Sequence, residues 1–123
     1  MAFTSPEKTS ADDRSLVVYA RWDARTRQTL RATIDDDLLA EHQARPLGQH
    51  SDRLERVLNY FRRGPQARKY VIVCTRAWEE WRIGVLSGQR GAPPAVLDDE
   101  RFNSEAAALH GVFLRRVRDL MQA

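Results

Sequence analysis

Three histidines, one cysteine and 17 acidic residues are the side chains of this 123-residue chain that could bind a metal ion or transfer protons. His42 and His50 are separated by a Pro-Gly loop, and His110 is distant in sequence. Helices that bind zinc through two histidines place them four residues apart, and the chain has no such pair. Cys74 has no second cysteine for a disulfide or a CxxC motif. We therefore predict no metal site in this chain, and we expect His110 to be a hydrogen-bonded histidine of the core or of an interface.

Other arrangements that support catalysis are also missing from the sequence. The acidic run Asp35–Asp37 lacks the alternating ligands, the glycine and the distal glutamate of a calcium loop, so it is better explained as the start of a helix. Neither a GxSxG motif nor a glycine-rich phosphate loop occurs. Cys74 lies in an apolar segment and is expected to be a small buried side chain. We predict no catalytic residue in this chain.

The segment "RAWEEWRI", residues 76–83, contains two of the chain's three tryptophans. Their rings could stack on nucleic-acid bases, pack into the core of the chain or fill a groove on another protein. Tryptophan and arginine together are typical of the energetic centres of protein interfaces, and the predicted helices already supply aliphatic core residues. We therefore predict a protein interface. Its expected residues are Trp78, Trp81, Arg82, Tyr60, Arg62, Arg115 and Arg116.

The chain is basic, with a net charge of +3 and a pI near 9.5, and of its 20 basic residues only Lys8 and Lys69 are lysines. Arginine serves phosphate contacts and protein interfaces alike, and it can also simply replace lysine on solvated faces. Acidic residues are interspersed among the arginines, and no strand offers the row of exposed aromatic residues that stacks bases. A small basic nucleic-acid-binding or regulatory protein is the alternative function, less favoured than a protein-binding subunit.

The first half of the chain predicts a tail and three helices. Residues 1–11 are small and polar and are expected to be a disordered tail. Apolar residues at spacings of three and four predict a helix from Asp12 to about residue 34 with one basic side. A short helix follows the acidic run and stops before Pro46. Ser51 is a good N-cap for a third helix, whose stripe is Leu54, Val57, Leu58 and Phe61 and which ends at Gly64-Pro65.

The second half predicts a hairpin and a long helix. Residues 69–75 and 81–87 are rich in β-branched and aromatic residues, which indicates two strands, although a helix over 76–87 is an alternative. A loop over "SGQRGAPP" follows. The last helix begins near Asn103 or Ser104, with Phe102 as a hydrophobic staple. Its core stripe is expected to be Ala106, His110, Phe113, Val117 and Leu120, with Arg115, Arg116 and Arg118 off it.

These elements predict an α+β fold that is mainly helical, with about four helices and a β-hairpin between the third helix and the long C-terminal helix. A single domain over 12–123 is expected. No apolar run approaches the roughly 18 residues that span a bilayer, so we expect no membrane association. The first residues lack the features of a secretory signal. Together with the single cysteine, these features favour the cytoplasm.

Five segments, taken in order, resemble the small (alpha) subunit of N,N-dimethylformamidase. They are "NYFRR" (59–63), "KYVIV" (69–73), "WEEWRI" (78–83), "DDERF" (98–102) and "ALHGVFLRRV" (108–117), and "LLAEHQARPLG" and "YARWDARTRQTL" fit the same order. The resemblance covers roughly residues 15–123. Val71 and Cys74 depart from the more tyrosine-rich strand of that family, which leaves the identity of the amide substrate open.

The resemblance implies a complex of two small and two large subunits, or multiples of that unit. Such complexes hydrolyse N,N-dimethylformamide to dimethylamine and formate at a single iron ion held by the large subunit. None of the family's catalytic residues is carried over to this chain, which needs no cofactor of its own under this hypothesis. The resemblance therefore implies a non-catalytic subunit that docks on the large chain and stabilises the assembly.

Overall fold

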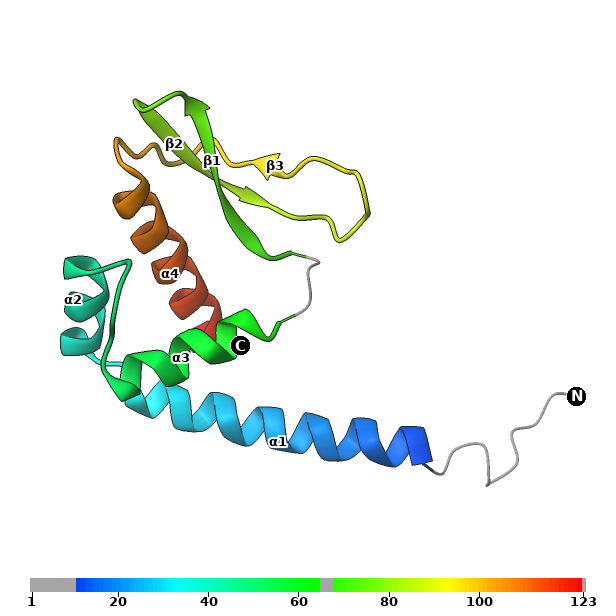
Figure 1. Cartoon of the computed structure of the whole chain (residues 1–123). Helices are drawn as coiled ribbons and strands as arrows, with labels where there is room; N and C mark the ends of the chain where they lie inside the picture. Colours follow the sequence, from blue (N-terminus) through cyan, green and yellow to red (C-terminus); the bar gives the residue numbers. More distant parts are fainter. Residues whose placement is uncertain (1–10, 65–67, 123) are drawn as a thin grey trace, which may run out of the picture. The chain divides into compact units, whose positions relative to one another are not determined.

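The computed structural model describes residues 11–64 and 68–122 of the chain (Figure 1). The predicted tail over 1–11 lies outside these residues except for Ala11, where the first helix starts. The chain divides into two compact units, one ending at Thr33 and the other running from Ile34 to the C-terminus. The single domain expected over 12–123 stays a prediction.

The first unit contains helix α1, Ala11–Thr33, in agreement with the predicted helix. Three threonine hydroxyls near its C-terminal end donate hydrogen bonds to the carbonyl four residues earlier, for example Thr26 Oγ1 to Trp22 O at 2.9 Å. Asp23 forms an ion pair with Arg27 at 3.0 Å, at the i,i+4 spacing that adds modest support to a helix. Leu16 and Tyr19, two of the residues whose spacing predicts this helix, are 67% and 59% exposed.

Helices α2, Asp36–Ala44, and α3, Asp52–Arg62, begin where the sequence predicts. Asp35 Oδ1 accepts the Leu38 amide at 2.9 Å, and Ser51 Oγ accepts the Leu54 amide at 3.3 Å, so both N-caps satisfy a free backbone donor. Ser51 also donates from its amide and its hydroxyl to the Glu41 carboxylate, both at 2.6 Å. This carboxylate therefore joins α2 to the first turn of α3.

The predicted apolar stripe of α3 faces the core. Leu54, Val57 and Leu58 are buried, and Phe61 is half-buried with its ring 6.1 Å from that of Phe113 in an edge-on arrangement. The helix ends at Arg62 and is capped by Arg63. Hydrophobic burial of this stripe holds α3 in the second unit.

The two predicted strands form the hairpin, and the alternative of a helix over 76–87 is wrong. Strand β1, Tyr70–Arg76, pairs antiparallel with β2, Glu80–Val85, and a bulge lies between Cys74 and Arg76. A third strand, β3, Ala95–Val96, pairs with the far edge of β2. The sequence did not predict β3, because two residues after a Pro-Pro pair carry no alternating pattern.

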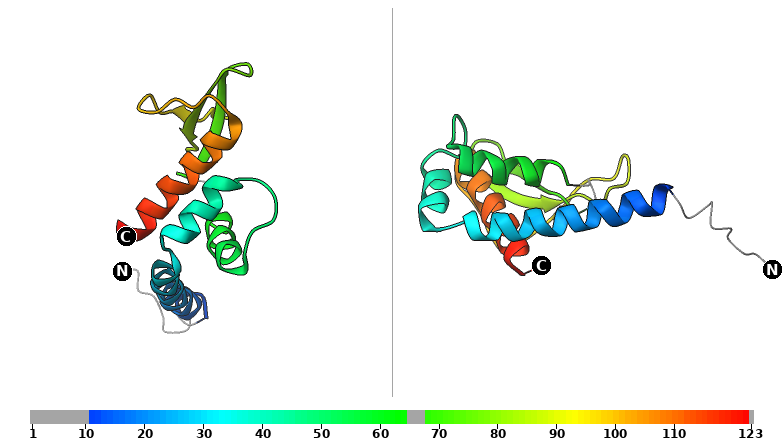
Figure 2. Two further views of the ribbon diagram at one scale, coloured as in Figure 1. Left: turned by 90° about the vertical axis from the view of Figure 1, so that its left-hand side faces the viewer. Right: turned by 90° about the horizontal axis from the view of Figure 1, so that it is seen from below.

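Helix α4, Glu105–Gln122, packs against β1, β2 and α2 (Figures 1 and 2). The Ser104 hydroxyl accepts the Ala107 amide at 3.1 Å, which makes Ser104 the predicted N-cap. The expected stripe is correct at Phe113, Val117 and Leu120, which are buried, and His110 is half-buried. It is wrong at Ala106, which is exposed in the first turn, before the helix reaches the core. The largest fully buried side chains among the described residues are Leu38, Leu54, Val57 and Ile83, and they form the centre of the core.

Phe102 contacts α4 further along than a hydrophobic staple would. Its backbone exchanges two hydrogen bonds with Trp81, at 2.8 and 2.9 Å, which fixes the segment before α4 to the edge of β2. Its ring lies over Gly111, where a Cβ atom would be only 2.8 Å from Phe102 Cε1. Gly111 therefore makes room for this ring.

The observed architecture confirms the predicted class, α+β and mainly helical, with the sheet between α3 and α4 in sequence. Among the residues that the structure describes, no helix has the length and apolar character needed to cross a bilayer.

Candidate partner interface

The two tryptophans of "RAWEEWRI" have opposite environments. Trp81 lies in β2, is only 9% exposed and forms its backbone bonds with Phe102. Trp78 lies in the turn between the strands and is 87% exposed. Trp81 thus has a core role that the sequence did not reveal, whereas Trp78 presents its ring to solvent.

The backbone at Trp78 is unusual for so large a residue. The Glu79 amide donates to Arg76 O at 3.0 Å, which closes a β-turn, and Trp78 occupies the third position with φ of 64°. Glycine or asparagine normally fills a turn position of positive φ, and other residues lose roughly 1–2 kcal/mol there. Folding of this chain gives no reason for an exposed tryptophan at that position. Strained, exposed residues of this kind concentrate at functional sites.

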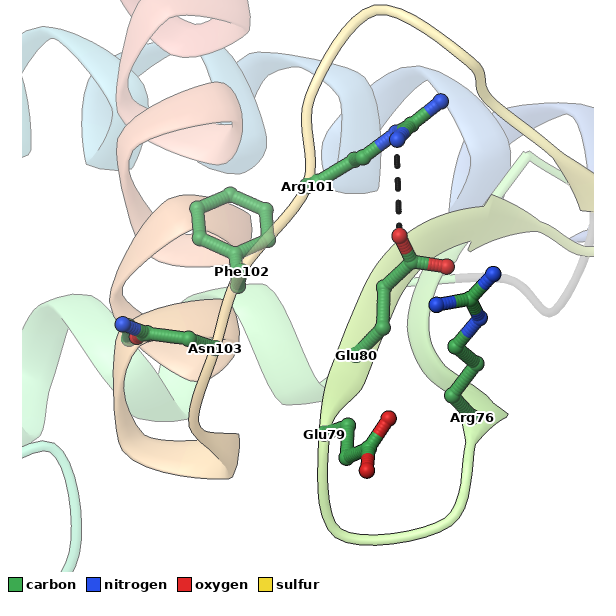
Figure 3. A pocket seen from close by; sticks show the side chains of 7 residues that line it. Arg76, Glu79, Glu80, Arg101, Phe102 and Asn103 are labelled. Atoms are coloured by element: carbon green, nitrogen blue, oxygen red, sulfur yellow. Dashed lines mark ion pairs between the residues drawn. The ribbon is translucent and has the colours of Figure 1, made fainter.

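Beside this turn is an open hollow of about 500 Å³ between the hairpin and the start of α4 (Figure 3). Glu80 lies between Arg76 and Arg101 there, and Arg101 Nε is 3.6 Å from Glu80 Oε1. The pKa of Glu80 is held below its usual value, mainly because the Thr75 hydroxyl donates to it, with Arg82 and Arg101 adding to the effect. The hollow is lined by Arg76, Glu79, Glu80, Arg101, Phe102, Asn103 and Ala107. Its lining therefore carries both signs of charge.

Two of the arginines predicted for the interface bind the acidic run 98–100 of this chain. Arg115 is buried and donates to Asp99 at 2.6 Å and to Glu100 at 2.7 Å. Arg82 donates to Asp98 at 2.6 Å. Both side chains therefore have a role within the chain, because both bind the acidic run 98–100 that precedes α4. Whether they also contact a partner stays a prediction.

The remaining predicted residues lie on α3 and α4. Arg116 is half-buried and donates to Tyr70 O at 3.2 Å, and its pKa is lowered, first by burial and then by the nearby charge of Arg62. Arg62 is exposed and pairs with Glu55 at 3.7 Å. Tyr60 is half-buried. Arg62 and Arg116 line one hollow of about 240 Å³, which does not include Tyr60.

The structure gathers all three histidines of the chain, which the sequence did not predict. We name His42, His50 and His110 the histidine cluster. The His42 ring lies 5.1 Å from that of His110 and 5.9 Å from that of His50, and it stacks on Phe113 at 4.0 Å. The Nδ1 atoms of His42 and His110 form a hydrogen bond at 2.9 Å, which confirms His110 as a hydrogen-bonded histidine. No short-range spacing could have shown this, because 68 residues separate the two rings.

Stacked rings make this cluster a packing element. Burial, followed by the charges of His110 and His50, lowers the pKa of His42 to about 4, so its ring is neutral near pH 7. Burial also lowers the pKa of His110. Within residues 11–64 and 68–122, no three His, Cys, Asp or Glu side chains are arranged to hold a metal ion.

Cys74 is exposed, so its predicted burial is wrong. Cys74 belongs to the exposed end of β1, where Cys74, Thr75 and Arg76 are all exposed, whereas the first four residues of the strand are half-buried. Its thiol donates to Arg76 O at 3.3 Å.

Comparison with known proteins relates the sequence of this chain to one family. Residues 17–123 match the family model described as N,N-dimethylformamidase alpha subunit. The chain is 42% identical over 113 residues to an N,N-dimethylformamidase alpha subunit of Alcaligenes sp, a match that covers 88% of this chain and 84% of the relative. It is 37% identical over 113 residues to one of Paracoccus aminophilus, covering 88% and 79%. The chain belongs to the family of N,N-dimethylformamidase alpha subunits.

Proposed function

We propose that this chain is the non-catalytic small subunit of an N,N-dimethylformamidase-like amidohydrolase. The observation that carries the proposal is the family match over residues 17–123, together with relatives that are named alpha subunits. An alpha subunit has a partner chain, and the large subunit is that partner. The complex hydrolyses N,N-dimethylformamide, or a related amide, to an amine and a carboxylate in the cytoplasm.

The iron ion of the proposed complex belongs to the large subunit. The described residues of this chain offer no three-ligand cluster for a metal, and the histidine cluster uses ring nitrogens for internal hydrogen bonds. Iron supplies Lewis-acid activation of the amide and of water when it is bound. This chain contributes surface and stability, in an assembly of two small and two large subunits or multiples of that unit.

The hairpin turn supports such a docking role. Trp78 offers a large exposed ring, and the adjacent hollow offers both signs of charge. An aromatic anchor with a polar rim is the usual anatomy of a protein interface.

Co-expression with the large subunit tests the proposal. We expect a stable heteromeric complex in native mass spectrometry, with iron and amidase activity that the small chain alone lacks. A small chain that stays alone in the presence of the folded large subunit would contradict the proposal. If the large subunit had the same amidase activity with and without the small chain, the stabilising role of the small chain would be contradicted.

The nucleic-acid-binding alternative gains no support from the family match. Several arginines that gave the chain its basic character are neutralised within it, since Arg27, Arg53, Arg82 and Arg115 each pair with an acid. Arginines paired in this way are poorer phosphate ligands.

A further inference from the structure

Residues of α2, α3, β1 and α4 enclose a hollow of about 240 Å³ within the second unit. Its walls are mainly apolar, and the described residues that line it include Leu47, Leu58, Val71, Ile72, Leu109 and Val112. Arg62 of α3 and Arg116 of α4 add positive charge to the lining. No aspartate or glutamate is among the described residues that line this space, which we name the arginine hollow.

Arg116 is a half-buried cation that no acid of the described residues pairs with. Its guanidinium donates one hydrogen bond, from Nη2 to Tyr70 O at 3.2 Å. A guanidinium has five N–H donors, so most of its donors remain available to a ligand or to water. The pKa of Arg116 is lowered, first by burial and then by the charge of Arg62. Since burying a cation costs free energy unless an anion pairs with it, an anion beside Arg116 would stabilise this arrangement.

Arg62 brings a second positive charge to the same hollow. Its side chain is 60% exposed, and its Nη1 atom donates to Asn59 Oδ1 at 3.0 Å and lies 3.7 Å from Glu55 Oε2. Glu55 is not a lining residue of the hollow, and its carboxylate also pairs with His50 at 3.2 Å. Ion pairs at a protein surface are weak, so an anion in the hollow can compete with Glu55 for Arg62.

The apolar walls and the two arginines together define the class of ligand. Binding pockets combine apolar walls with a few polar groups that orient the ligand, and an arginine matches a carboxylate with two parallel hydrogen bonds. A carboxylate therefore fits the two arginines, and a hydrocarbon tail fits the aliphatic walls, which an inorganic phosphate would leave unfilled. The volume is below the roughly 300 Å³ of pockets that hold drug-sized ligands, so the ligand is small.

We propose that the arginine hollow binds a small aliphatic monocarboxylate, with its carboxylate between Arg62 and Arg116 and its tail against Leu109 and Val112. Because residues of α3, β1 and α4 line the hollow, the bound ligand contacts three elements at once and stabilises the folded second unit by mass action. The inference concerns this chain alone and does not rest on the proposed function.

Titration calorimetry of the full chain with acetate, butyrate and hexanoate tests the inference, with hexanamide as the neutral counterpart of hexanoate. We expect the affinity to rise about threefold to fourfold for each CH₂ group that the hollow buries. Hexanamide should bind at least about tenfold more weakly than hexanoate, because it offers the arginines no negative charge. At equal concentration, hexanoate should raise the thermal midpoint of the chain more than hexanamide does.

A matched pair of variants at Leu47 tests the location of the site. Leu47 lines the hollow but is 64% exposed, so its replacement leaves the core intact. Leu47→Asp adds a carboxylate to the lining, and Leu47→Asn has nearly the same shape without the charge. We expect Leu47→Asp to bind hexanoate about fivefold more weakly than Leu47→Asn, because like charges repel, and the two variants to bind hexanamide equally.

A second pair of variants tests the role of Arg116. Arg116→Gln should weaken hexanoate binding at least about tenfold, because it removes a charged donor. Arg56→Gln removes an exposed arginine of α3 that does not line the hollow, and it should bind hexanoate as the wild type does. Circular dichroism shows whether both variants fold, and if Arg116→Gln does not fold, the Leu47 pair decides the question.

Four results would each overturn the inference. If none of the carboxylates binds at millimolar concentration, the hollow is not a ligand site. If hexanoate and hexanamide bind equally well, the arginines take no part in binding. If hexanoate binds equally to the two Leu47 variants, it binds elsewhere on the chain. If hexanoate binds the free chain but not its purified complex with the large subunit, the hollow is filled by the partner chain and not by a small molecule.

Discussion

Mild acid should destabilise the second unit through His42. This side chain is only 4% exposed, and His110, His50 and Glu41 are the titratable groups whose charges act on it. Its pKa falls from an ordinary 6.5 to about 4, chiefly because burial disfavours the charged ring. The Nδ1–Nδ1 hydrogen bond to His110 adds a second reason, because two fully protonated rings would present two donors and no acceptor.

The sign follows from linkage. The unfolded chain binds a proton at His42 near pH 6.5, whereas the folded chain does so near pH 4. The contribution of neutral His42 to the free energy of unfolding is therefore fully present above pH 6.5. It declines as the pH falls from 6.5 to 4, and below pH 4 the ring is protonated in both the folded and the unfolded chain. Between pH 7.5 and pH 5.5, proton binding at His42 alone should lower the free energy of unfolding by about 1 kcal/mol. The lowered pKa of His110 acts in the same direction.

Urea unfolding followed by circular dichroism at pH 7.5 and 5.5 measures this loss. The carboxylates with lowered pKa values, among them Asp35 and Asp99, stay ionised in the folded and the unfolded chain over this pH range. Their contribution to the stability of the fold is therefore lost only at lower pH. His42→Phe keeps an aromatic ring on Phe113 and removes the titrating group, so its stability should depend less on pH. Gln43→His adds an exposed histidine on the same helix and should leave the dependence unchanged. An equal loss in wild type and His42→Phe would refute the reasoning.

Three further substitutions test individual contacts. Trp81→Ala should lower the free energy of unfolding by about 3 kcal/mol or more, because it empties a core position; a change below 1 kcal/mol in urea unfolding would place the ring outside the core. Trp78→Gly should leave stability unchanged or raise it by up to about 1 kcal/mol, since glycine accepts the positive φ, and it should weaken binding of the large subunit about tenfold in titration calorimetry. Equal affinity would remove the hairpin turn from the interface. Gly111→Ala should destabilise α4 by roughly 1–3 kcal/mol despite the better helix propensity of alanine, because its Cβ would collide with the Phe102 ring; a higher thermal midpoint would show that the ring moves aside easily.

Local patterns predicted the elements of this fold well. The caps at Asp35 and Ser51, the stripe of α3 and the change to β-branched residues after Lys69 are all short-range signals, and the structure confirms each. Strand β3 was not predicted, because its two residues owe their extended conformation to pairing with β2 and not to a local sequence pattern.

The side-chain environments were harder to predict, because they depend on contacts between distant segments. The histidine cluster joins one residue of α2, one residue of α4 and one residue of the loop that precedes α3. Arg115 is buried only because the acidic run before α4 folds back beside it. The two tryptophans differ in burial because a turn reverses the chain between them, and composition carries no information about which ring that turn leaves in solvent.

The Glu41 carboxylate has a consequence for how the second unit opens. It accepts both the amide and the hydroxyl of Ser51, and that hydroxyl in turn caps α3. Unwinding of the end of α2 would remove Glu41 from Ser51 and leave the first turn of α3 without its support. The two short helices should therefore exchange their amide hydrogens as one cooperative segment, with similar opening free energies, although a loop with no regular hydrogen-bonding pattern separates them in the chain.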